Sequence, residues 1–347
     1  MTAPAPRLAA LEAQHLRRDL PFTPGAGPNG GEWFLPWAAL QAAFAARGVA
    51  LHTPDVHGAA PLAFELHLNA QRGAGRVPSY CFIYEDPLVR PLNGDPAVLS
   101  RYRKVFTWHL QHQRELPNAV ALDYPNALQP RATPGWAGRD LPVVMLASNK
   151  ALMRADPRSL HERRVATIRA FERLAPQDFT LYGQGWHIPA VQPGALGRGL
   201  KRLNEWASRL QPARQPFPSW RGRAARKTDI LDRARFAICY ENSRGSPGYL
   251  TEKLFDALAS GCVPVYIGAE GWQQRMPPAV CIDGDRFADP ADLVASLQQV
   301  SPEEFESRQA AGRAFLQAPA TQRFSQAHWC RVLVETVMSD LPQEQEG

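Results

Sequence analysis

The sequence has few cysteines and no long hydrophobic run. It contains five cysteines, and none of them forms a CxxC pair. This spacing predicts reduced packing residues and no metal site. No apolar run approaches the roughly 20 residues that cross a bilayer, and residues 1–20 have no uninterrupted apolar core of the signal-peptide kind. A cytoplasmic location is therefore expected. The cysteines are Cys81, Cys239, Cys262, Cys281 and Cys330.

The composition is that of a globular protein with an uneven charge. The 347 residues are 45% hydrophobic and 21% charged, which is enough material for two cores. The net charge is +6, and residues 198–235 hold eleven Lys or Arg against three acids. Such a segment suits nucleic acid, an anionic membrane or a phosphorylated small molecule. No nucleic-acid-binding module is visible, so we expect a solvated basic face, with peripheral contact at the inner face of a membrane as an open alternative.

Apolar segments alternate between strand-like and helix-like patterns along the chain. This alternation predicts an α/β fold with parallel sheets covered by helices. A Pro- and Gly-rich segment, residues 127–142, is predicted to link two domains, residues 1–138 and residues 139–347 with the terminal helices. Strands are predicted at 62–68, 79–85, 104–108, 141–149, 179–186, 235–242 and 262–268. Helices are predicted at 31–49, 159–175, 251–260, 291–300, 302–317 and 324–338.

A polar loop, residues 241–249, interrupts the apolar pattern between a predicted strand and a predicted helix. The carboxyl edge of an open α/β sheet is where ligands bind, and a helix N-terminus there favours a phosphate. Lys253 adds a full charge, while Glu241, Asn242, Ser243 and Glu252 offer acceptors for sugar hydroxyls. Each residue alone has a plain structural explanation as a turn, helix-dipole or surface residue. Together they favour a nucleotide-sugar site.

The run FAICYENSRGSPGYLTEKLFDALASGCVPVYIGA closely resembles the signature of the α1,3/1,4-fucosyltransferases, glycosyltransferase family 10. Residues 52–55, 84–91, 104–109, 147–164, 181–186 and 281–287 resemble further parts of bacterial members. The resemblance implies a GT-B architecture of two Rossmann-like domains facing across a cleft, with the donor held by the C-terminal one. It also implies inverting transfer of fucose from GDP-fucose to a hydroxyl of a glycan acceptor, with no cofactor and no essential metal.

The same resemblance assigns donor-binding roles residue by residue. Lys253 would contact the diphosphate, and Glu252 would hold ribose or fucose hydroxyls. Arg164 fits the register of a diphosphate-binding arginine best, with the adjacent Arg163 as its rival; Lys227 is almost equally well explained as a surface lysine. The full set is Arg164, Lys227, Tyr240, Glu241, Asn242, Ser243, Tyr249, Thr251, Glu252 and Lys253.

Inverting transfer needs a general base for the acceptor hydroxyl. Glu85 is the predicted base because it ends a strand of the N-terminal domain and matches the acidic position of the family. Asp86 is the first rival, and Pro87 favours a plain turn at this point. His109 is the third candidate, although a single histidine at a strand end more often packs or caps.

Two alternatives stay open at the level of the sequence. One is a related transferase that uses another nucleotide sugar, since residues 243–248 form a variable loop. The other is a non-catalytic nucleotide- or glycan-binding protein on the same scaffold. The presence of both Glu85 and the Lys253 region argues against the second alternative. For the acceptor, the bacterial character of the chain suggests lipopolysaccharide or another surface glycan.

Overall fold

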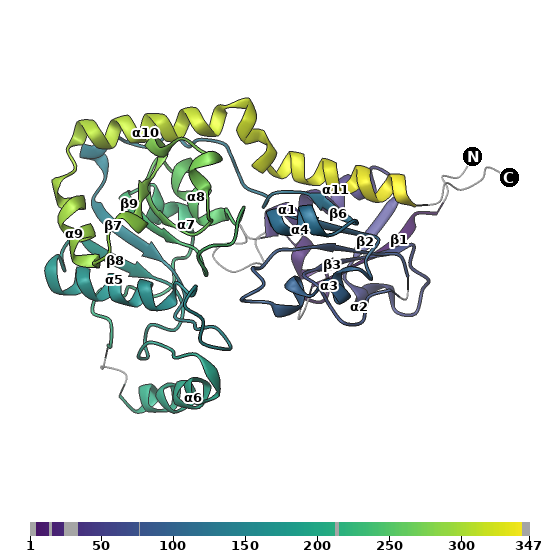
Figure 1. Cartoon of the computed structure of the whole chain (residues 1–347), viewed down its shortest axis with the longest axis horizontal. Helices are drawn as coiled ribbons and strands as arrows, with labels where there is room; N and C mark the ends of the chain where they lie inside the picture. The colour runs from purple at the N-terminus through teal and green to yellow at the C-terminus, as the bar shows by residue number, and fades with distance from the viewer. Residues whose placement is uncertain (1–4, 14–15, 24–33, 76, 212–214, 342–347) are drawn as a thin grey trace. The chain divides into compact units, whose positions relative to one another are not determined.

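The computed structural model describes residues 5–13, 16–23, 34–75, 77–211 and 215–341, and the chain divides into two compact units. The first unit comprises Met1–Asn126 and Gln322–Gly347, and the second comprises Ala127–Thr321. Each unit is built on one parallel sheet flanked by helices (Figure 1). The predicted α/β class with two parallel-sheet domains is therefore confirmed. None of the helices in the described ranges has the length and hydropathy needed to cross a bilayer.

The first unit has a six-stranded sheet in the order β2-β1-β3-β4-β5-β6. All neighbouring strands in it run parallel. Its core joins aromatic side chains of the sheet, such as Phe82, to Trp37 and Trp329 of two helices. The strands are β1 (Arg7–Glu12), β2 (Val49–His52), β3 (Phe64–Leu68), β4 (Ser79–Phe82), β5 (Lys104–Thr107) and β6 (Ala119–Ala121). The helices are α1 (Leu35–Ala45), α2 (Pro54–His57), α3 (Pro96–Leu99), α4 (Leu110–Glu115) and α11 (Gln326–Asp340).

The second unit has a five-stranded parallel sheet in the order β11-β10-β9-β7-β8. Strand β10 is buried at every residue and β9 at all but one, as expected for a parallel sheet covered on both faces. The strands are β7 (Leu141–Leu146), β8 (Phe179–Tyr182), β9 (Ala234–Tyr240), β10 (Val263–Ile267) and β11 (Ile282–Asp283). The helices are α5 (His161–Leu174), α6 (Gly194–Leu210), α7 (Lys227–Leu231), α8 (Glu252–Ala259), α9 (Pro290–Gln299) and α10 (Pro302–Gln317).

Local start signals explain where the C-terminal helices begin. Asp289 caps α9 by accepting a hydrogen bond from the Ala291 backbone N–H, and Ser301 caps α10 through the Glu304 N–H. Both helices have proline at a first position, where its missing N–H costs nothing. The three predicted C-terminal helices, residues 291–300, 302–317 and 324–338, are therefore found close to their predicted bounds as α9, α10 and α11.

The division of the chain differs from the predicted boundary after residue 138. The first unit ends at Asn126, and the last helix of the chain, α11, also belongs to it. The reason is the apolar stripe of α11: Trp329, Leu333 and Val337 are fully buried in the core of the first sheet. A stripe of this kind has no sequence feature that says which of two sheets it will cover.

The predicted linker, residues 127–142, belongs to the second unit. Arg139 is 1% exposed and donates hydrogen bonds to the backbone carbonyls of Leu231, Ala234 and Ser260. Burial lowers the pKa of its guanidinium, but an arginine stays charged in proteins. This buried side chain fastens the segment to the ends of α7, β9 and α8.

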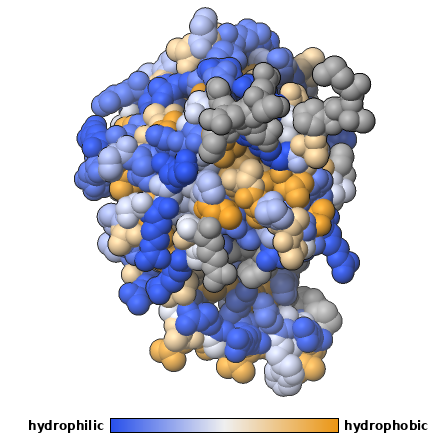
Figure 2. Space-filling view, turned by 90° about the vertical axis from the view of Figure 1, so that its right-hand side faces the viewer, coloured by the Kyte–Doolittle hydropathy of each residue, from blue (hydrophilic) through white to orange (hydrophobic). Residues whose placement is uncertain are grey.

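The basic segment contains a helix that the sequence pattern did not predict. Helix α6 covers residues 194–210, and in Figure 1 it lies apart from the β7–β11 sheet, at the lower end of the view. Orange hydrophobic side chains lie beside blue hydrophilic ones at this end in Figure 2. Arg214 of the basic segment lies outside the described residues. The segment is therefore a solvated face in part and an amphipathic helix in part.

Candidate functional site

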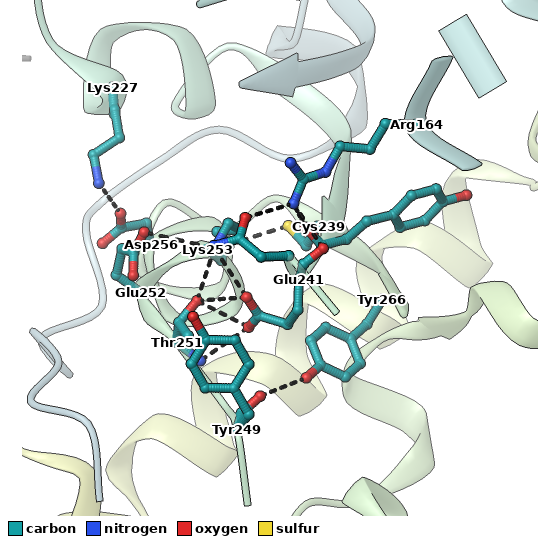
Figure 3. A network of polar contacts seen from close by, with 12 residues as sticks. Arg164, Lys227, Cys239, Glu241, Tyr249, Thr251, Glu252, Lys253, Asp256 and Tyr266 are labelled. Atoms are coloured by element: carbon teal, nitrogen blue, oxygen red, sulfur yellow. Dashed lines mark hydrogen bonds and ion pairs between the residues drawn. The ribbon is translucent and has the colours of Figure 1, made fainter. Parts of the chain in front are cut away.

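Glu241 is the centre of a polar network at the carboxyl end of β9. Its side chain is 0% exposed, and its carboxylate accepts hydrogen bonds from the Thr251 backbone N–H at 3.0 Å and the Thr251 hydroxyl at 2.8 Å. The Lys253 ammonium donates to the other carboxylate oxygen at 2.9 Å (Figure 3). Burial raises the pKa of Glu241, and Lys253 opposes this shift. The carboxylate therefore ties the end of β9 to the start of α8.

Lys253 is held among three acceptors. Its Nζ lies 2.9 Å from a carboxylate oxygen of Glu241, 3.2 Å from the Thr251 hydroxyl and 3.9 Å from a carboxylate oxygen of Glu252. Burial alone would lower the pKa of Lys253, but the two carboxylates outweigh it and the pKa is raised. The side chain keeps 22% exposure. A charged amine is thus placed beside the N-terminus of α8 with part of its surface open.

Gly268 is required for this network. A Cβ at this position would lie 2.5 Å from the Glu241 Cγ and 2.5 Å from the Tyr266 hydroxyl. Both neighbours are buried and hydrogen-bonded, so neither can move away cheaply. The glycine after β10 therefore lets the buried carboxylate sit against the neighbouring strand.

The structure distinguishes Arg164 from Arg163. Arg164 is buried on α5, and its Nη2 donates to the Tyr240 carbonyl at 2.8 Å, the Glu241 carbonyl at 2.6 Å and the Asn242 side-chain oxygen at 3.1 Å. Arg163 instead donates to the carbonyls of residues 287 and 288. Of the two, Arg164 is therefore the arginine that reaches the loop after β9.

His161 marks a concentration of positive charge at this site. The pKa of His161 is lowered to about 3, first by burial and then by the nearby cations of Arg164, Lys150 and Lys253. These three cations come from α5, the segment after β7 and the start of α8. The carboxylates of Glu241, Glu252 and Asp256 lie near Lys253, and Asp156 and Glu162 line the adjoining pocket. The fold thus brings cations from three separate segments close to His161.

A pocket in the second unit is lined by one of these cations, Lys150, and by His161. Its other walls are residues 151–152 and 154–156, the first turns of α5 and residues 190–193. Lys150 and His161 were not among the sequence-predicted residues. Lys150 stands just past a buried strand, at the carboxyl edge of the sheet, so its position carried a signal. The depressed pKa of His161 depends on its surroundings in the fold, so no feature of the sequence pointed to this residue.

The other predicted donor residues have mixed surroundings. Tyr240 is 1% exposed and packs in the core, where only its carbonyl meets Arg164. Tyr249 is buried, and its carbonyl accepts a hydrogen bond from the Tyr266 hydroxyl at 3.1 Å. Ser243 is 1% exposed and forms a bridge with Ser159. The backbones of these three residues therefore help to shape the loop, while the Ser243 hydroxyl is buried without a hydrogen-bond partner among the described residues.

Lys227 is also brought to α8, but its partner is a carboxylate. Its Nζ lies 2.5 Å from Asp256, and both side chains are mostly buried. Burial raises the pKa of Asp256, and Lys227 opposes the shift. The pair joins α7 to α8 (Figure 3). The observed contact therefore places Lys227 one helix turn away from the Glu241 network.

In the first unit, the three candidate bases differ in burial and in their hydrogen bonds. The backbone of Glu85 is held by Asn69 and Asn93, and its side chain is half-buried. Asp86 is 0% exposed, and one carboxylate oxygen accepts the Leu88 N–H at 2.7 Å, which stabilises the turn. Its second carboxylate oxygen is buried without a hydrogen-bond partner among the described residues, and the choice of Glu85 as the base stays a prediction.

His109 lies near Asp86, and burial lowers its pKa. It caps α4 by accepting the Gln111 N–H, and its ring stacks on His112 with the centroids 4.4 Å apart. It is 8% exposed. A buried ring that caps a helix and stacks on a second histidine is poorly placed to take a proton from a glycan hydroxyl.

One carboxylate pair has the spacing that can hold a divalent cation. Asp283 and Asp285 are separated by one glycine. In the structure Asp283 accepts the Asp285 backbone N–H, and Asp285 forms an ion pair with Arg244 at 3.0 Å. Within the described ranges, no group of three or more His, Cys, Asp or Glu side chains is arranged to hold a metal ion.

The comparisons with known proteins meet at this second unit. Residues 213–335 match the family model described as "Glycosyltransferase family 10 (fucosyltransferase) C-term". The matched segment, about a third of the chain, resembles the C-terminal domain of this family. The match contains β9, α8 and β10, and with them the Glu241–Lys253 network. The family predicted from the signature is thus confirmed.

One curated relative in this family is an alpha-(1,4)-fucosyltransferase of Arabidopsis thaliana. It is 41% identical over 66 residues, which are 19% of this chain and 16% of the plant protein. The aligned stretch thus spans about a sixth of that relative's length. This likeness is local and covers one segment of each chain.

Two solved structures resemble the chain over nearly its whole length. An α1,3-fucosyltransferase solved with GDP-fucose has a TM-score of 0.51 at 12% identity and covers 100% of this chain and 94% of its own. The sucrose-phosphate synthase of Thermosynechococcus elongatus has a TM-score of 0.58 at 13% identity and covers 96% and 98%. At these identities the likeness shows the fold, which is that of the GT-B glycosyltransferases.

Proposed function

We propose that this family-10 protein transfers fucose from GDP-fucose to a hydroxyl of a glycan acceptor, with inversion at the anomeric carbon. The observation that carries the proposal is the convergence of Arg164 and Lys253 on the loop after β9, at the N-terminus of α8. A diphosphate matches this set of donors and charges. The match to a fucosyltransferase family model supports fucose as the sugar.

The proposed reaction is a single displacement. The acceptor oxygen attacks the anomeric carbon, and its proton passes to the Glu85 carboxylate. The bond from the anomeric carbon to the β-phosphate oxygen breaks, and its electron pair leaves with GDP. Negative charge that grows on the leaving phosphate is stabilised by Lys253, Arg164 and the backbone N–H groups of α8. No divalent cation is required by this scheme.

The contacts refine the parts played by the two acidic residues of the signature. Glu241 is saturated by Thr251 and Lys253, so its part is to hold the lysine and the start of α8 in place. Glu252 keeps 31% exposure, and its carboxylate is suited to ribose or fucose hydroxyls. In this proposal Glu241 is a positioning residue and Glu252 is a contact residue.

A panel of nucleotides tests the proposal directly. At 100 times its dissociation constant, a ligand of the native state adds about 2.7 kcal/mol to the free energy of unfolding. GDP and GDP-fucose should therefore raise the melting temperature, while UDP, CMP and ADP leave it unchanged. Transfer is then measured with GDP-fucose and glycan acceptors. A response to UDP with none to GDP would favour a related transferase that uses another nucleotide sugar.

A further inference from the structure

Helix α6 carries a continuous exposed apolar face. Five large hydrophobic residues recur along it at intervals of three or four, which places them on one side of the helix. The described residues include ten exposed large hydrophobic side chains, and half of them lie on this one helix. The five are Leu196 at 85% exposure, Leu200 at 53%, Leu203 at 63%, Trp206 at 62% and Leu210 at 64%.

The contacts of α6 with its own unit lie on another side of the helix. Gly197 is the buried residue of α6, and a Cβ there would lie 1.9 Å from the Gln192 carbonyl. Asn204 and Ser208, which share this side by the helical repeat, are less exposed than the leucines. The helix therefore rests on a small polar side and turns its apolar side outward.

The remaining side of α6 is basic. Arg198, Lys201, Arg202 and Arg209 also recur at helical spacing, against one acid, Glu205. Glu205 pairs with Lys201 at 3.6 Å. No ion pair joins the three arginines to an acid among the residues that the structure describes. Helix α6 thus combines an apolar Leu/Trp face with an adjoining face of net positive charge.

We propose that α6 docks this protein on the surface of an anionic phospholipid membrane. A helix with such faces lies in the plane of the interface: its leucines and tryptophan enter the acyl boundary and its basic residues meet the headgroups. Tryptophan is enriched at this depth, and anionic lipids attract each basic residue close to the surface.

A lipid surface fits these observations better than a protein partner does. Charge complementarity favours lipid, because four basic residues border this apolar face along the helix and anionic headgroups attract each of them. Residues 190–193, which line the pocket beside Lys150 and His161, lead directly into α6. Docking through α6 would therefore hold that pocket close to the membrane.

Flotation with lipid vesicles tests the proposal on the full chain, without any activity assay. The chain is mixed with vesicles of phosphatidylglycerol and phosphatidylcholine, or with vesicles of phosphatidylcholine alone. We expect binding to the anionic vesicles that falls with added salt, and at least about tenfold weaker binding to the neutral ones. Failure to bind anionic vesicles, or equal binding to both kinds, would overturn the proposal.

Variants of the two faces locate the contact. Leu200→Ser/Leu203→Ser should weaken binding at least about tenfold, because it removes two of the five apolar side chains that enter the acyl boundary in this proposal. Arg198→Gln/Arg202→Gln should weaken binding to anionic vesicles alone. Matched controls outside α6 are Leu174→Ser, an exposed leucine at 48%, and Arg47→Gln. Parent-like binding by the leucine variant would show that α6 is not the membrane contact.

Two further measurements separate other uses of the apolar face. The melting temperature of Leu200→Ser/Leu203→Ser should equal that of the parent, since both side chains are exposed; a large fall would mean that the face packs within the chain. Sedimentation without lipid reports self-association. A parent dimer that the leucine variant dissociates, combined with no vesicle binding, would assign the face to a second copy and refute the membrane proposal.

Discussion

Replacing Lys253 by methionine removes the cation that faces a fully buried carboxylate. Glu241 is 0% exposed, and the ammonium of Lys253 lies 2.9 Å from it. Removing one partner of a buried ion pair costs about 3–5 kcal/mol, because the other charge is left uncompensated. Lys253 itself keeps 22% exposure, which lets water reach the pair. We therefore expect a loss of about 2–4 kcal/mol in the free energy of unfolding.

Chemical and thermal unfolding measure this loss. For a unit of this size each kcal/mol corresponds to roughly 2–4 °C in melting temperature, so the variant should melt well below the parent. Lys201→Met is the matched control, because Lys201 forms an exposed pair with Glu205 and such pairs contribute about 0–1 kcal/mol. Equal, small effects of the two substitutions would refute the assignment of Lys253 to a buried pair.

A double variant separates stability from binding. Glu241→Gln/Lys253→Met removes both charges of this ion pair, and glutamine still accepts the hydrogen bonds of Thr251. Its stability should recover by about 2 kcal/mol relative to the sum of the single variants, as coupled neighbours do. Its affinity for GDP should stay low, because a charge-assisted hydrogen bond to phosphate contributes about 1.5–3 kcal/mol. Recovery of GDP affinity together with stability would make Lys253 purely structural.

Three further expectations follow from named contacts. Glu85→Gln should keep the melting temperature and GDP affinity but lose about 10²–10⁴-fold in transfer; loss in Asp86→Asn with normal turnover in Glu85→Gln would move the role to Asp86. Transfer should persist in excess EDTA, and complete loss rescued by Mn²⁺ would contradict the cation assignment. The pKa of His161 is about 3 in the fold and ordinarily 6.5, so its stabilising contribution is complete above pH 6.5 and is lost as the pH falls toward 3. His161→Gln should therefore lessen the loss of stability between pH 7 and pH 5 by about 1–2 kcal/mol, as unfolding measurements at the two pH values would show.

The sequence by itself determined the alternation of strands and helices and the family. Apolar runs bounded by Pro, Gly or charge identified the strands β3, β4, β5, β7, β8, β9 and β10, because a buried parallel strand is apolar at nearly every residue. Strands β1, β2, β6 and β11 were not predicted. Strands β6 and β11 have only three and two residues, and β1 consists mostly of alanine and leucine, which favour helices. The signature from Phe236 to Gly268 located the polar network, because its residues are close together along the chain.

Contacts between distant segments were decided only by the tertiary structure. Arg163 and Arg164 are neighbours with the same side chain, and only the orientation of α5 turns Arg164 to the carbonyls after β9, 76 residues away. The burial of Glu241 depends on Gly268 and on its strand pairing. Helix α11 packs on the first sheet because Trp329 is buried in the core of that unit.

Helix α6 shows the same limit for a surface. Its sequence holds the alternation of leucine and arginine, but an apolar stripe usually predicts a buried face. Only the tertiary structure shows that the side of Gly197 meets the rest of the unit and that the leucines do not. Periodicity is a property of one segment and can be found in the sequence. Burial depends on which other segments pack against that one, and these contacts form only when the chain folds.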